Sequence, residues 1–181
     1  MRPFVLFGLL IGVCLMGAPY AAAQTPETLK NLITWRICQL SSELMMVYQR
    51  PGYSSSAPES ERFFVVSVEK NPRAYVRCRF AEDHGRFFCE ASQAYYEEGT
   101  ARQPNVYLTR PRIEALERLG FVAHGATDNL TYERELSPKP DFDAITTFIL
   151  TALHDGLGVR EETDLDVSAP FAGSLVTACR Y

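Results

Sequence analysis

The chain has 181 residues with 18 basic and 22 acidic side chains, and this acidic balance argues against a general nucleic-acid binder. Its length suits one domain with its own hydrophobic core. Beyond the N-terminal leader, no apolar run approaches the length of a membrane span, so we expect no span in the mature chain.

The first 23 residues have the features of a cleaved secretory signal peptide. Arg2 is their only charged residue, an apolar run follows it, and Ala21 and Ala23 supply a small-residue cleavage pattern. A membrane anchor is the rival interpretation, but the apolar run is short for a span. Cleavage near Ala23 would leave residues 24–181 as a single domain, and losing Arg2 leaves 17 basic against 22 acidic residues, a net charge of −5. We therefore predict a periplasmic or secreted protein.

The first half of the mature chain predicts one helix and then strands. Pro26 suits the first helical position, and apolar residues follow at the helical period into the mid-forties. A loop is expected over 53–61. The run FFVVSV within 62–69 predicts a central strand, and Asn71-Pro72 predicts a turn.

Two alternating segments, 74–81 and 86–94, predict a β-hairpin around Glu-Asp-His-Gly. If the loop has an even number of residues, Cys78 faces Cys89 directly, and a disulfide between them becomes possible. A three-residue loop would shift the register by one residue. The two cysteines would then be small buried thiols.

The cysteine count indicates two disulfides. Removing Cys14 with the leader leaves four of the five cysteines, an even number in an oxidising compartment. If Cys78 pairs with Cys89, then Cys38 pairs with Cys179 by elimination. That second disulfide would tie the C-terminal tail to the first helix.

The second half predicts helix, strand and helix. Thr109 suits a helix N-cap, and Leu119-Gly120-Phe121 predicts the end of that helix at a left-handed glycine. Residues 132–136 fit a strand, and apolar residues recur at helical spacing from Phe142 to Leu157. From about residue 160 we expect a solvated acidic tail. The order is therefore helix, three strands, helix, strand, helix.

This order, with a Leu-Gly-aromatic turn and an Asn-containing strand start, resembles the TY-Chap family, which unites type III secretion chaperones with YbjN-like proteins. The segments that carry the resemblance are AYVRCRF (74–80), FCEA (88–91), IEALERLGF (113–121), NLTYERE (129–135) and LHDGLGV (153–159). It implies an α+β fold in the order α-β-β-β-α-β-α, with helices packed on an antiparallel sheet, and a binding role without catalysis. The export leader and the four mature cysteines depart from the family pattern, so the secretion-chaperone role and its effectors are not carried over.

The sequence contains no catalytic, cofactor or metal signature, so we expect no enzyme and no cofactor. His84, His124 and His154 lack the spacing of metal ligands, and no nucleophile elbow, phosphate loop or dinucleotide fingerprint occurs. Asp164 and Asp166 resemble the start of a calcium loop but lack its glycine and distal glutamate.

The polar face of the hairpin is the candidate binding site. Tyr75, Arg77, Arg79 and Phe88 could receive an acidic or aromatic peptide. Cross-strand pairing explains the same residues more simply, with Arg77 opposite Glu90 and an arginine over an aromatic ring.

The function expected from these features is that of an exported, chaperone-like, non-enzymatic domain that binds an unidentified protein or peptide. One alternative is a cell-envelope enzyme or accessory factor whose site is assembled from scattered residues. Another is a structural subunit that forms a homodimer, as the secretion chaperones of the resembled group do.

Overall fold

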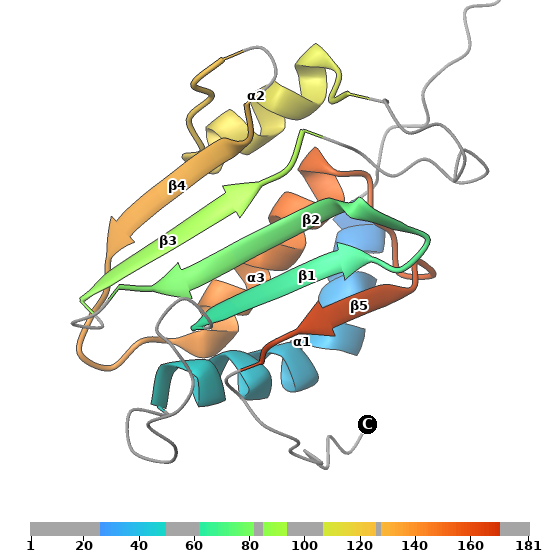
Figure 1. The fold of residues 1–181 in the computed structure, drawn as a ribbon. Helices are drawn as coiled ribbons and strands as arrows, with labels where there is room; N and C mark the ends of the chain where they lie inside the picture. The colour runs from blue at the N-terminus through green and yellow to red at the C-terminus, as the bar shows by residue number, and fades with distance from the viewer. Residues whose placement is uncertain (1–25, 50–61, 82–84, 94–106, 126–127, 171–181) are drawn as a thin grey trace, which may run out of the picture.

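The described chain folds into a five-stranded antiparallel sheet with helices on one face (Figure 1). The computed structural model describes residues 26–49, 62–81, 85–93, 107–125 and 128–170. Its elements are α1 (Pro26–Gln49), β1 (Phe63–Val68), β2 (Asn71–Phe80), β3 (Arg86–Ala91), α2 (Arg110–Arg118), β4 (Leu130–Glu135), α3 (Phe142–Thr151), the π-turn η2 (Ala152–Gly156) and β5 (Leu165–Ser168). The predicted α+β class and the order of helices and strands are confirmed. Within the described residues, no helix is long and apolar enough to cross a membrane.

The sheet has the strand order β4-β3-β2-β1-β5, and every neighbouring pair is antiparallel. Strand β5 was not predicted, because its residues follow an acidic segment that we expected to be a solvated tail. The side chains of Asp164 and Asp166 are exposed as expected. Their backbone nevertheless belongs to the sheet, since Asp166 pairs with Ser67 and the Asp164 carbonyl accepts a hydrogen bond from the Glu69 amide.

The turn before β2 lies two residues earlier than predicted. The chain reverses at Glu69-Lys70, and Asn71, predicted to be in the turn, is already the first residue of β2. Asn71 pairs with Val68 through a local irregularity of the β1–β2 register. The register shifts there by three residues, since Val68 would otherwise face Ala74, and strand pairing therefore begins directly after the turn.

The hairpin register is as predicted for an even loop. Cys78 lies opposite Cys89, and the two form a disulfide with an S–S distance of 2.06 Å. Cys38 on α1 is also disulfide-bonded. Its expected partner, Cys179, lies outside the described residues, so that pairing stays a prediction, as do the loop over 53–61 and the hairpin turn.

Helix α2 ends as its sequence predicts. Gly120 has a φ of 96°, and the amides of Gly120 and Phe121 donate to the carbonyls of Glu117 and Leu116. These two bonds are the paired closing bonds of a Schellman motif. At the other end Thr109 is the N-cap, but its side chain forms no capping bond. Pro111 removes the second helical amide as a donor.

The core lies between the sheet and the pair α1 and α3, which are packed side by side behind it in Figure 1. Their contact includes a buried hydrogen bond of 3.0 Å from the Ser41 hydroxyl to Thr146. The core contains, among others, Leu32, Leu40, Leu44, Phe64, Val66, Val76, Phe87, Leu116, Ile145, Ile149 and Leu153.

The last helix keeps its predicted apolar positions but changes geometry near its end. After Thr151 the chain continues as the π-turn η2, which ends at Gly156. A Cβ atom on Gly156 would lie 2.5 Å from Leu116 Cδ2. The glycine therefore lets α2 pack directly on the turn.

Candidate functional site

The face of the sheet turned away from α1 and α3 is polar and aromatic, and no described helix lies over it (Figure 1). We call it the open face. Strand alternation places every second residue of β1, β2 and β3 there, and cross-strand register aligns them. These residues include Phe63, Val65 and Ser67 on β1, Tyr75, Arg77 and Arg79 on β2, and Arg86, Phe88 and Glu90 on β3. The four predicted binding residues therefore share one face.

Two arginines of the open face, Arg77 and Arg79, lie over aromatic rings. The guanidinium carbon of Arg77 is 4.7 Å from the centre of the Phe63 ring, and that of Arg79 is 5.2 Å from the centre of the Phe88 ring. The predicted packing of arginine over an aromatic ring is thus present twice. Within the described residues, neither guanidinium forms an ion pair.

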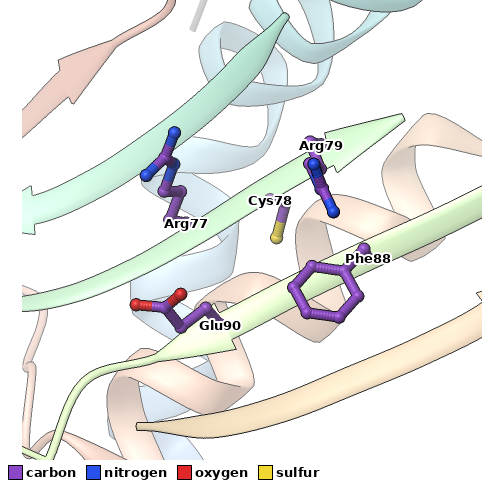
Figure 2. Close-up of a pocket in the computed structure, with 5 residues that line it drawn as sticks. All are labelled: Arg77, Cys78, Arg79, Phe88 and Glu90. Carbon is purple, nitrogen blue, oxygen red and sulfur yellow. The ribbon is translucent and has the colours of Figure 1, made fainter. Parts of the chain in front are cut away.

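Glu90 lies opposite Arg77 in register, but its carboxylate is bound elsewhere. Its Oε1 atom accepts the Tyr75 hydroxyl at 2.6 Å and the Asn129 amide at 2.6 Å. The Asn129 amide also donates to the Tyr75 hydroxyl oxygen at 3.0 Å. Figure 2 shows the Arg77 guanidinium turned away from Glu90. Arg77 therefore lies opposite Glu90 as predicted, but the two side chains form no ion pair.

Tyr75, Glu90 and Asn129 form a network that connects β2, β3 and the start of β4. Partial burial and the hydrogen bond to Glu90 raise the pKa of Tyr75 to about 12. Burial raises the pKa because the charged phenolate is poorly solvated there. The hydrogen bond to Glu90 also raises the pKa, because only the protonated phenol can donate it. Tyr75 therefore stays a neutral donor to Glu90 at any physiological pH.

A hollow of about 180 Å³ lies on the hairpin, between residues of β2 and residues of β3 (Figure 2). It is lined by Arg77, Cys78, Arg79, Phe88 and Glu90. Pockets for drug-sized molecules span about 300–1,000 Å³, so this hollow suits a side chain or a small anion.

An ion pair lies beside this hollow, toward the edge strand β4. Glu133 faces Phe88 in register and forms an ion pair of 3.0 Å with Arg86. Both side chains are about half exposed, so the pair adds little stability. It does partly neutralise Glu133, and within the described residues Arg77 and Arg79 remain cations without an ion pair beside the hollow.

A second polar cluster surrounds His154, which is 1% exposed. Its Nδ1 atom is 2.7 Å from Asp155 Oδ1, and its Nε2 atom is 2.8 Å from Thr28 Oγ1 on α1. A carboxylate only accepts, so in the neutral imidazole Nδ1 carries the proton and Nε2 accepts from the threonine hydroxyl. Sequence reasoning missed this cluster, because Thr28 comes from a distant part of the chain.

Of the other two histidines, only His124 lies within the described residues, and it joins neither cluster. His124 is exposed and bonded to Thr131 at 2.7 Å, while His84 lies outside the described residues. No group of three or more potential metal ligands occurs in the described part of the chain.

No protein-family model, no curated protein and no solved structure matches the chain. The open face and the His154 cluster are therefore the two candidate functional sites. Of these two, the open face is accessible and carries uncompensated charge, whereas the His154 ring is enclosed.

Proposed function

We propose that this protein is a non-enzymatic, chaperone-like binding domain that receives a segment of another protein on the open face of its sheet. The observation that carries the proposal is the pair Arg77 and Arg79. Both guanidinium groups lie over aromatic rings beside a hollow, and neither forms an ion pair within the described chain. A guanidinium held on a ring is already oriented, so it loses less freedom when it binds a carboxylate.

The resemblance to the TY-Chap family supports a binding role. The segments that carry it form β2, β3, α2, β4 and the end of the last helix. A shared α+β architecture does not by itself fix a function. The residues of the open face therefore support binding, and the resemblance adds the expectation of a chaperone-like client.

We also propose that the domain acts in the periplasm or outside the cell, after cleavage of a signal peptide near Ala23. The Cys78–Cys89 disulfide supports an oxidising compartment, because cytosolic thiols are kept reduced. N-terminal sequencing of the mature protein tests the cleavage site directly.

Photo-crosslinking tests the binding role. A photoreactive residue at Val65 or Thr131 would flank the two arginines, and one at Glu117 on α2 serves as the remote control. We expect crosslinks to another protein from the first two positions, lost in Arg77→Gln/Arg79→Gln, with the crosslinked partner peptide identified by mass spectrometry. Crosslinks that are equal at all three positions would contradict the proposal, and crosslinks to a second copy alone would indicate a homodimer.

A hydrolytic or transfer enzyme is the second candidate function, and the contacts of His154 favour it. Thr28, His154 and Asp155 have the connectivity of nucleophile, base and orienting acid. The hollow described above is not beside this cluster, and His154 is enclosed. Labelling of Thr28 by a fluorophosphonate probe, abolished in His154→Gln, would establish the enzyme; no labelling of the folded protein would reject this nucleophile.

A further inference from the structure

We infer that the open face recognises an extended protein segment with carboxylates at alternate positions, and that Tyr75 and Asn129 are positioning residues that keep Glu90 from neutralising Arg77. This inference rests on the proposed binding function. It adds the chemistry of the segment and names the residues that keep the site available.

The spacing of the two arginines sets the spacing of the ligand charges. Arg77 and Arg79 are two residues apart on β2, so their Cα atoms are separated by about 6.6–6.8 Å along the strand. An extended segment repeats its side chains on one face at the same interval. Arg77 leans toward Phe63 on β1 and Arg79 toward Phe88 on β3, so the long side chains of two glutamates at positions i and i+2 of a segment along β2 can each reach one guanidinium.

Charge complementarity favours acidic side chains over aromatic ones. The rings of Phe63 and Phe88 already have an arginine on one face, whereas the hydrogen-bond donors of both arginines are directed to no carboxylate in the described chain. A guanidinium binds a carboxylate with two parallel hydrogen bonds. The hollow between Arg79 and Glu90 is large enough for one such side chain.

Glu90 is the internal competitor of such a ligand. It lies directly opposite Arg77, at a separation where cross-strand charges normally pair. Two hydrogen bonds of 2.6 Å, from Tyr75 and Asn129, hold its Oε1 atom on the other side. Bonds to a charged acceptor are stronger than an exposed ion pair, so this network prevails over Arg77.

The test uses the mature chain, residues 24–181, with its disulfides intact. Two labelled peptides of equal composition, TEVEVET and TEEVVET, differ in that only the first has glutamates two positions apart. Fluorescence anisotropy at low salt should show about tenfold tighter binding of the alternating peptide, because only that peptide places one carboxylate at each guanidinium. Arg77→Gln/Arg79→Gln should abolish the preference. Arg86→Gln, which removes one positive charge from the edge ion pair, should not.

The positioning role has its own readout. Tyr75→Phe should weaken binding of the alternating peptide several-fold, because Glu90 is released toward Arg77, and Asn129→Ala should do the same. Adding Glu90→Gln should restore the affinity in either background, since a neutral amide cannot pair with Arg77. Thermal unfolding checks that each variant is folded. Tyr75→Phe is the milder of the two changes, because it removes only a hydroxyl group.

The outcomes separate this inference from the proposed function. Binding of TEVEVET that survives Arg77→Gln/Arg79→Gln would reject the open face as the site and with it both proposals. Equal binding of the two peptides, abolished in that variant, would reject only the alternate spacing. Tighter binding of a thymidine tetranucleotide than of either peptide would assign the arginines to phosphate, and failure of Glu90→Gln to restore affinity would reject the positioning role.

Discussion

Phe87 and Phe88 are neighbours on β3, yet they lie on opposite faces of the sheet and in opposite environments. Phe87 is fully buried against the helix side, where its ring lies 5.4 Å from that of Phe80. Phe88 is half-buried under Arg79 on the open face. One set of alternate residues therefore holds the domain together, and the other is available for recognition. Substitutions on the two faces should have separable effects.

The largest difference is expected between the two phenylalanines themselves. Phe87→Ala should lower the free energy of unfolding by about 3–5 kcal/mol, because it removes a fully buried ring and leaves a cavity. Phe88→Ala should cost about 1 kcal/mol, since it loses an exposed cation–π contact and partial burial. Urea unfolding of both variants with disulfides intact measures the two values. Equal losses would contradict the division of the sheet into two faces.

Removing the Cys78–Cys89 disulfide should have the next largest effect. The two residues are 11 positions apart, and a loop of that length predicts a loss of about 3 kcal/mol in Cys78→Ala/Cys89→Ala. Both cysteine side chains are buried, and Cys78, although it lines the hollow, offers no charged group to a carboxylate. The double variant, once folded, should therefore bind the alternating peptide as wild type does, and a loss of binding without unfolding would show that the open face depends on the disulfide.

The raised pKa of Tyr75 should add about 1 kcal/mol to the free energy of unfolding, after allowance for solvent screening, and this contribution should depend on pH. Its pKa is about 12 in the folded protein against an ordinary value of 10.0, so folding favours the neutral phenol. The stability that this provides is complete below pH 10 and is lost as the pH rises toward 12. The difference in unfolding free energy between wild type and Tyr75→Phe should shrink over that window. A difference that stays constant above pH 10 would argue against the bond to Glu90.

The smallest effect on stability is expected at the arginines. Arg77→Gln/Arg79→Gln removes two exposed charges without an ion pair in the described chain, so only the exposed cation–π contacts are lost and the free energy of unfolding should change by no more than about 1 kcal/mol. Thermal unfolding beside the peptide-binding assay measures both properties in one variant. A large loss of stability would mean that these arginines support the fold and would remove the reason to assign them to a ligand.

The architecture was largely predictable because it follows from local patterns. The alternation in 74–80 and 86–91 places Phe87 and Cys89 on one face and Phe88 on the other, and the hairpin register follows from the loop. The Leu119-Gly120-Phe121 turn was equally clear, since a left-handed residue is best supplied by glycine.

The features that were missed depend on distant parts of the chain. Strand β5 has four residues and follows acidic ones, so no local signal distinguishes it from a solvated tail. The bonds of Glu90 could not be foreseen, because Asn129 lies 39 residues away and its amide takes the place expected for Arg77. The candidate residues were thus predictable as a group, whereas their partners were not.

The position of β5 also determines when the domain can be completed. Strand β1 forms early in the chain, but one of its two edges is satisfied only by Leu165–Ser168, near the end of the described chain. Until those residues leave the ribosome, the edge of β1 exposes unpaired amides and carbonyls that can pair with another chain. Truncation before Leu165 should therefore yield a chain that aggregates, even though every other helix and strand is present.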